Sequence, residues 1–165
     1  MKLKEGGFTV NKNQLELFVD DYSKLMQSIT ISLQAIQKEL FKDSRITPDQ
    51  FNLMDVVNKR KSCTSTVLAN IFNVKKSSIT AIINRLVEKG LIKRVFNEKD
   101  RRLHFLELTD EGQGILREER EKILELLLPI GDKLSDKELD DLKLHLSKIE
   151  NQLDIIKKGM NKNEN

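Results

Sequence analysis

Apolar positions along this chain recur at steps of three and four residues, which is the spacing of one buried face of an α-helix. The spacing predicts helices over residues 13–42, 48–58, 65–72, 76–89, 110–128 and 136–157. Thr47 and Ser135 precede two of these helices and stand three residues before Gln50 and Glu138, so each pair is expected to form a capping box.

Local signals also predict where two of the helices begin or end. Thr64 is expected to cap the helix 65–72, and Thr109 is expected to cap the helix 110–128. Pro129 and Gly131 are expected to end or kink that later helix. Three apolar residues of the helix 65–72 are expected to point inward: Val67, Leu68 and Ile71.

The pattern changes after Gly90, a residue suited to ending the helix before it. Residues 91–96 and 103–108 are two short apolar runs typical of strands, joined by a polar loop. A two-stranded hairpin is marginal alone, so it must lean on the helices as a wing. We therefore expect a single domain over 1–165 that is mainly α with a small β-wing, in which a winged helix-turn-helix module over 47–109 is flanked by long dimerisation helices over 13–42 and 110–157.

The helix 76–89 carries two different stripes. Its apolar stripe follows the template of a buried face and consists of Ile79, Ile82, Ile83, Leu86 and Val87. A second stripe starts two residues earlier, about 200° around the helix, and consists of Ser77, Thr80, Ala81, Asn84 and Arg85. This outward stripe is short, uncharged at its start and ends in Arg, which suits entry into a groove lined with base edges and phosphates.

Charge is distributed unevenly along the chain. The 165 residues have a net charge of +3, but residues 75–104 hold nine Lys or Arg against three acids, whereas residues 105–156 hold seven against fourteen. Positive charge is therefore gathered on the segment with the unusual helix, as an electrostatic footprint on nucleic acid requires.

Composition argues against several classes of protein. No apolar stretch approaches the length needed to cross a bilayer, so a cytoplasmic protein without membrane contact is expected. Cys63 is the single cysteine and cannot form an intrachain disulfide. His104 and His145 have no cluster of further ligands at metal-binding spacing, and the sequence shows neither a glycine-rich phosphate loop nor a nucleophile with a base. We expect no enzymatic activity, no metal and no cofactor.

The outward stripe and the hairpin loop offer groups that suit DNA. Hydroxyl groups at the start of the helix can donate to phosphates beside the positive helix terminus, and Asn84 can offer its amide to an adenine edge. Arg85 either reaches a phosphate or pairs with Asp100 to support the wing. In the loop, an Arg can enter the minor groove while Asp100 orients it.

At this point the chain resembles a known family. The run S-S-I-T-x-x-I-x-R-L-V-E-K-G-L-I at residues 77–92, D-R-R at 100–102 and L-T-D-E-G at 108–112 are similar to the winged-helix regulators of the MarR (multiple antibiotic resistance regulator) family. The order of elements agrees from about residue 13 to 157. One departure is Lys75, where the family often has Asp or Ser as a helix cap.

The resemblance implies a homodimer whose first, fifth and sixth helices intertwine and whose two winged modules read a palindromic operator. It implies that Arg102 enters the minor groove with Asp100 as its orienter, and that Ser77, Ser78, Thr80 and Ala81 face the major groove. It also implies a small-molecule effector, with a pocket between the dimer arms and the winged module. The long apolar rows of the helices 13–42, 110–128 and 136–157 independently favour a second copy as their cover.

The sequence therefore predicts a dimeric, sequence-specific regulator of transcription that binds double-stranded DNA, most simply as a ligand-responsive repressor. Two alternatives are a winged-helix protein-interaction module that does not read DNA, and a thiol-based redox sensor acting through Cys63. The predicted DNA-binding residues are Thr64, Ser65, Lys75, Lys76, Ser77, Ser78, Thr80, Ala81, Asn84, Arg85, Lys99, Asp100, Arg101 and Arg102.

Overall fold

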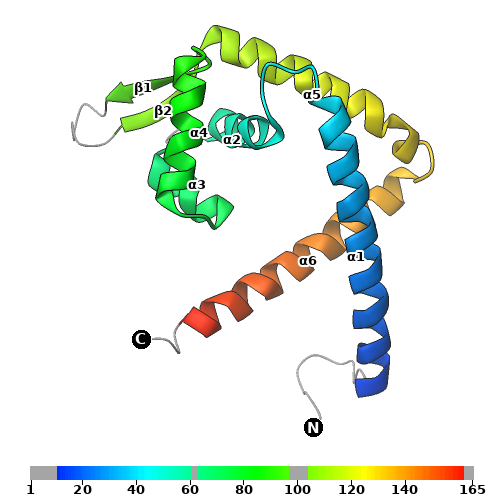
Figure 1. Ribbon diagram of the computed structural model, residues 1–165. Coiled ribbons are helices and arrows are strands. Elements are labelled where there is room, and N and C mark those ends of the chain that lie inside the picture. Colours follow the sequence, from blue (N-terminus) through cyan, green and yellow to red (C-terminus); the bar gives the residue numbers. More distant parts are fainter. Residues whose placement is uncertain (1–10, 61–62, 97–103, 162–165) are drawn as a thin grey trace. The chain divides into compact units, whose positions relative to one another are not determined.

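The computed structural model describes residues 11–60, 63–96 and 104–161. It is mainly helical with one two-stranded sheet, which confirms the predicted fold class (Figure 1). The elements in chain order are α1 (Lys12–Leu40), α2 (Pro48–Lys59), α3 (Ser65–Phe72), α4 (Lys76–Glu88), β1 (Ile92–Phe96), β2 (His104–Leu108), α5 (Asp110–Gly131) and α6 (Asp136–Asn161). The chain divides into two compact units, residues 1–119 and 120–165, so that α5 belongs partly to each.

Side-chain caps explain why several helices begin where they do. Thr47 Oγ1 accepts a hydrogen bond from the Gln50 amide at 3.3 Å, and Gln50 Oε1 accepts one from the Thr47 amide at 3.1 Å. Ser135 and Glu138 make the same reciprocal pair at the start of α6. Both predicted capping boxes are thus confirmed, and each satisfies backbone donors that the first turn of a helix leaves unpaired.

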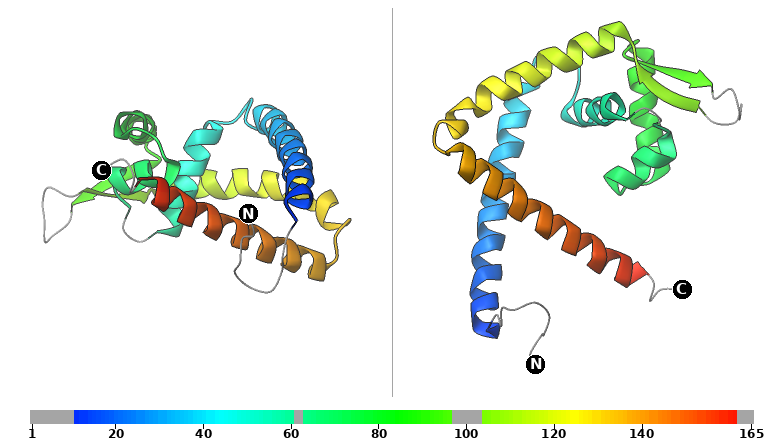
Figure 2. Two further views of the ribbon diagram at one scale, coloured as in Figure 1. Left: turned by 90° about the horizontal axis from the view of Figure 1, so that it is seen from below. Right: turned by 180° about the vertical axis from the view of Figure 1, so that it is seen from behind.

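The helix-turn-helix module packs around one apolar core. α3 packs against α4, and both Figure 1 and Figure 2 show these two helices beside the hairpin. The core side chains come from every element of the module and are fully buried, among them Met54, Leu68, Ile83 and Leu86. Because α4 contributes Ile79, Ile83 and Leu86 of its apolar stripe to this core, the opposite stripe faces outward.

The hairpin is antiparallel and closely tied to the helices. Ile92 stands opposite Leu108 and Phe96 opposite His104, so residues 92, 94 and 96 share one face of β1. The Leu106 amide donates to the Cys63 carbonyl at 2.9 Å, which adds a short bridge from the chain before α3. β2 is therefore hydrogen-bonded both to β1 and to the segment before α3, and a free hairpin would lack the second of these contacts.

Two glycines shape the chain around the hairpin. Gly90 ends α4 at φ +70°, a backbone conformation that favours glycine and that confirms its predicted role. Gly112, in the first turn of α5, lies so close to Leu91 that an added Cβ would stand 2.1 Å from the Leu91 carbonyl oxygen. The start of α5 can therefore approach the start of β1 only because residue 112 has no side chain.

Two details of the sequence-based prediction are wrong. Ile71 was expected to point inward but is 39% exposed, and Ala69 is buried in its place because α3 turns its Leu68–Ala69 edge to the core. α5 was expected to stop near residue 128 but continues through Pro129, and it ends at Gly131, the second of the two residues expected to end or kink it. Proline lacks one amide donor, and a single lost hydrogen bond near a helix end does not stop the last turn.

The long helices leave many apolar side chains on the surface of each unit. In α1 the exposed set includes Leu15, Phe18, Leu25, Ile29, Leu33 and Ile36. In α6 it includes Leu139, Leu142, Leu146, Leu153 and Ile156, which belong to the long apolar row predicted for this helix. Among the described residues, no helix has the length and apolar character needed to span a bilayer.

Candidate nucleic-acid interface

The two stripes of α4 lie as the sequence predicts. Ile79, Ile83 and Leu86 are buried, and Ile82 and Val87 are half-buried. On the other stripe Ser77, Ala81, Asn84 and Arg85 are exposed and Thr80 is half-buried. The small-polar stripe of a well-packed helix is therefore presented to solvent, where it is open to a large partner.

The amino end of α4 follows a tight turn. Asn73 adopts a left-handed conformation at φ 51°, which ends α3 and lets α4 begin three residues later. Lys75 occupies the N-cap position, and no side chain within the described chain caps this helix. The exposed amide groups of the first turn stand next to Lys75, Lys76, Ser77 and Ser78, a combination that suits a phosphate.

Thr80 makes a hydrogen bond within its own helix. Its hydroxyl donates to the Lys76 carbonyl within α4 at 2.8 Å, so its proton is already used. Its predicted contact with DNA stays a prediction, and donation to a phosphate would require this internal hydrogen bond to break. The oxygen still has lone pairs, so Thr80 can accept a hydrogen bond or make an apolar contact through its methyl group.

Asn84 has a partner that sequence reasoning missed. Arg94 Nη2, on β1, donates to Asn84 Oδ1 at 2.6 Å. A period of two in the sequence places Arg94 on the same face of β1 as the apolar Ile92, but the contact of β1 with α4 appears only in the folded structure. Arg94 therefore belongs to the candidate interface, although it was not among the predicted residues.

The remaining predicted residues fall into two groups. Thr64 Oγ1 accepts from the Val67 amide at 3.3 Å, which confirms its role as a cap, and Ser65 beside it is half-buried at the start of α3. Lys99, Asp100, Arg101 and Arg102 lie outside the described residues, so their DNA contacts stay predictions. For the same reason the choice for Arg85, between a phosphate and Asp100, stays open.

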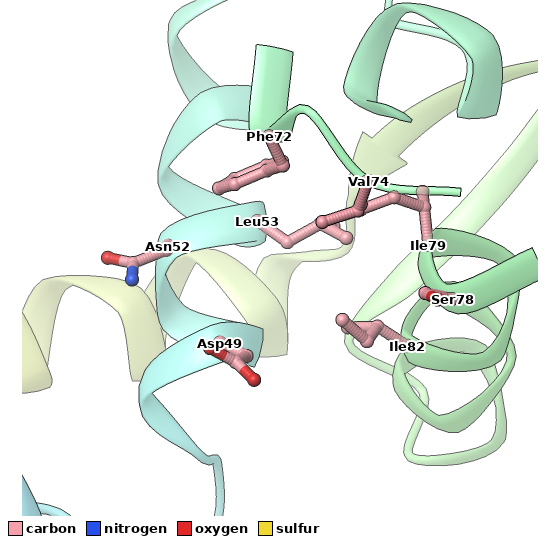
Figure 3. Close-up of a pocket in the computed structure, with 8 residues that line it drawn as sticks. All are labelled: Asp49, Asn52, Leu53, Phe72, Val74, Ser78, Ile79 and Ile82. Carbon is pink, nitrogen blue, oxygen red and sulfur yellow. The ribbon is translucent and has the colours of Figure 1, made fainter. Parts of the chain in front are cut away.

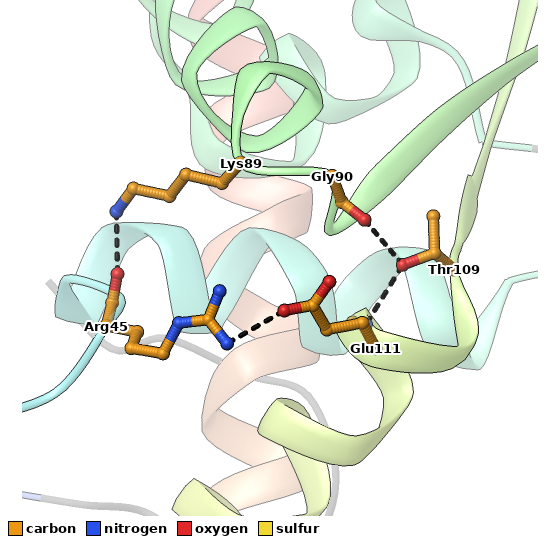
Figure 4. Close-up of polar contacts among 6 residues, drawn as sticks. Arg45, Lys89, Gly90, Thr109 and Glu111 are labelled. Carbon is orange, nitrogen blue, oxygen red and sulfur yellow. Dashed lines mark hydrogen bonds and ion pairs between the residues drawn. The ribbon is translucent and has the colours of Figure 1, made fainter.

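A polar junction holds the module to the chain on either side (Figure 4). Lys89 Nζ, just after α4, donates to the Arg45 carbonyl at 2.6 Å and to Gln50 Oε1 at 3.1 Å. Arg45 Nη1 pairs with Glu111 Oε1 of α5 at 2.8 Å, and Thr109 Oγ1 donates to the Gly90 carbonyl at 2.7 Å. The carboxyl end of α4 is thereby fixed to the segment before α2 and to the start of α5.

A cavity of about 340 Å³ lies between α2 and α4 (Figure 3). Leu53, Phe72, Ile79 and Ile82 give it an apolar surface, and Asp49 of α2 lies at its edge. Ser78 also borders the cavity, so its surface adjoins the amino end of α4.

The surroundings of Cys63 are those of a core residue. Its side chain is fully buried, and burial raises the pKa of the Cys63 thiol, with the Arg60 charge opposing this more weakly. Reactive cysteines are exposed and have a lowered pKa, so both features argue against the redox alternative. Within the described part of the chain, no group of His, Cys, Asp or Glu is arranged to hold a metal ion.

Comparisons with known proteins agree with this geometry. The sequence profile described as the MarR family matches residues 46–103. MdtR, an HTH-type transcriptional repressor of Bacillus subtilis (strain 168), is 38% identical over 96 residues, which are 54% of this chain and 62% of MdtR. YpoP, an uncharacterised HTH-type transcriptional regulator of the same strain, is 30% identical over 108 residues, which are 66% of this chain and 77% of YpoP.

Among solved structures, Streptococcus pneumoniae FabT in complex with DNA superposes with a TM-score of 0.72 at 25% identity. The match covers 84% of this chain and 99% of that chain. The fold of this chain thus has a counterpart in a protein that was solved in complex with DNA.

Proposed function

Because this chain belongs to the MarR family of transcription regulators, we propose that it acts as a homodimer that binds a palindromic double-stranded DNA operator. In this proposal the bound protein represses transcription, and a small-molecule effector lowers its affinity for the operator. The relative MdtR is named a transcriptional repressor, and FabT was solved in complex with DNA. We assign the protein a cytoplasmic role and no enzymatic reaction.

The outward stripe of α4 is the observation that carries this proposal. Ser77, Ala81 and Asn84 are small or uncharged and exposed, and the opposite face of their helix buries Ile79, Ile83 and Leu86. Such a stripe can approach base edges without burying an unpaired charge, while Lys75, Lys76 and Arg85 at its ends can neutralise phosphates. The predicted loop residues Lys99, Arg101 and Arg102 would add contacts in the neighbouring minor groove.

The uncovered apolar rows support the homodimer. α1 and α6 each expose a regular series of large apolar side chains, and surfaces of this kind mark places where another chain packs. A twofold-symmetric pair would carry two copies of α4. If both enter the same side of the duplex, the centres of the two half-sites should lie about 10 bp apart.

Selection of bound fragments from genomic DNA tests the proposal. We expect purified protein to enrich a palindromic sequence and to bind it with an affinity that falls steeply as salt rises, because several phosphates are neutralised. A protein-interaction module would show weak retention on DNA and little dependence on salt. Repeating the selection with aromatic or phenolic compounds tests the effector, since a ligand that prefers one spacing of the two α4 helices must change the affinity.

A further inference from the structure

The contact between Arg94 and Asn84 joins the hairpin to the outward stripe of α4. The two residues come from different elements, and the 2.6 Å distance between Arg94 Nη2 and Asn84 Oδ1 is that of a strong hydrogen bond with a charged donor. Both side chains are exposed, so the contact lies on the surface that is proposed to meet DNA. It is made before any nucleic acid arrives.

The strand holds Arg94 in place for this contact. Ile92 lies two residues earlier on the same face of β1 and is 1% exposed, so the start of this face is packed, whereas Phe96 at its far end is 65% exposed. The Arg94 side chain therefore starts from a fixed strand beside α4. A pre-ordered pair loses less conformational entropy on binding than two free side chains would lose.

The contact changes what Asn84 can offer to a base. An asparagine side chain has one oxygen that accepts and one NH2 group that donates two hydrogen bonds. With one lone pair of Oδ1 already used by the Arg94 guanidinium, the NH2 group is the part of Asn84 whose hydrogen-bonding capacity is fully available to another partner. The guanidinium keeps further N–H groups of its own, so the pair presents hydrogen-bond donors side by side.

This donor surface matches one base better than the others. In the major groove guanine shows two adjacent acceptors, N7 and O6, whereas adenine shows one acceptor and the N6 donor. A free asparagine suits adenine because its oxygen can accept from N6. We infer that Arg94 sets the base preference of Asn84, turning it from adenine to guanine. The inference rests on the proposed function and replaces the adenine contact expected from the sequence.

The test measures which base pair the protein prefers at each position, and not only how tightly it binds DNA. Duplexes are made from the selected operator with each of the four base pairs at every position of a half-site, and their dissociation constants are measured for the wild type, Arg94→Met, Asn84→Ala and Asn84→Asp. Lys93→Met is the matched control. Lys93 is the neighbouring cation on β1, points to the other strand face and pairs with Glu107 at 3.3 Å.

For the wild type we expect one position in each half-site to favour guanine over adenine by roughly 5- to 150-fold. Arg94→Met should abolish or reverse that ratio at this position alone. Asn84→Ala should abolish it at the same position, and a double variant that combines Arg94→Met with Asn84→Ala should lose no more of the preference than either single variant. Asn84→Asp keeps the oxygens for Arg94 but has no NH2 group, so it should lose the guanine preference too. Lys93→Met should leave the ratio unchanged.

Three results would overturn the inference. Arg94→Met could lower the affinity equally for all four base pairs, which would make Arg94 a phosphate contact only. The position that responds to Asn84→Ala could favour adenine in the wild type. Lys93→Met could change the ratio as much as Arg94→Met does. Failure of the wild type to enrich any sequence would instead refute the proposed function itself, and unchanged melting curves of the variants show that each result concerns DNA contact and not folding.

Discussion

Replacing Gly112 by Ala should separate the start of α5 from the hairpin. The new Cβ would lie 2.1 Å from the Leu91 carbonyl oxygen, whereas ordinary contacts need at least 3.0 Å, so the backbones must move apart by about 1 Å. That carbonyl accepts from the Thr109 amide at 3.1 Å, and this hydrogen bond would be weakened. Overpacking costs about 1–3 kcal/mol and a weakened hydrogen bond about 0.5–1.5 kcal/mol, which together suggest about 2–4 kcal/mol.

Gly114→Ala is the matched control, because it makes the same change in the same helix with nothing within 4 Å of the new Cβ. Alanine favours a helix over glycine by about 1 kcal/mol at either position, so this gain cancels when the two variants are compared. Thermal unfolding at equal protein concentration should place Gly112→Ala about 5–15 °C below Gly114→Ala. The shifted hairpin should also weaken binding to the selected operator. Equal melting temperatures would refute the close-approach argument.

Three further variants test other parts of the account. Arg102→Ala should weaken operator binding by about 1–3 kcal/mol in a titration with labelled DNA, and an unchanged affinity would remove the hairpin loop from the interface. Leu146→Asp should convert the proposed dimer to monomer in analytical ultracentrifugation, because it places a charge in the exposed apolar row of α6; a dimer of unchanged affinity would contradict the assigned surface. Since burial raises the pKa of the Cys63 thiol, alkylation at neutral pH should be far slower in the folded protein than in urea. Equal rates in the two states would revive a sensing role for this cysteine.

Local chemistry explains why most of the fold could be predicted from the sequence. Caps such as Thr47 with Gln50 act over three residues, and the left-handed turn at Gly90 depends on that residue alone. The two stripes of α4 follow from a helical period that the sequence displays directly. Because these signals involve neighbours along the chain, the helix boundaries agree within a few residues.

Contacts between distant segments account for what was missed. Nothing near Lys89 in the sequence points to the Arg45 carbonyl, and nothing near Arg45 points to Glu111, so the junction appears only once the segments are folded. Arg94 was overlooked because its partner lies on another element. That α3 buries Ala69 and exposes Ile71 depends on how this helix rotates against its neighbours. The loop with Lys99 and Arg102 lies outside the described residues, so its part in the interface stays a prediction.

The affinity of Ala81→Glu for the selected operator tests the central claim most directly. Ala81 is exposed in the middle of the outward stripe, so the substitution adds one negative charge where base edges and phosphates would lie while leaving the packed face of α4 untouched. Gln113→Glu adds the same charge at an exposed position of α5 and serves as the control. The account predicts that Ala81→Glu loses at least about 100-fold in affinity at an unchanged melting temperature, as expected for a carboxylate forced against the duplex. Binding as tight as that of Gln113→Glu would show that this face of α4 does not meet DNA.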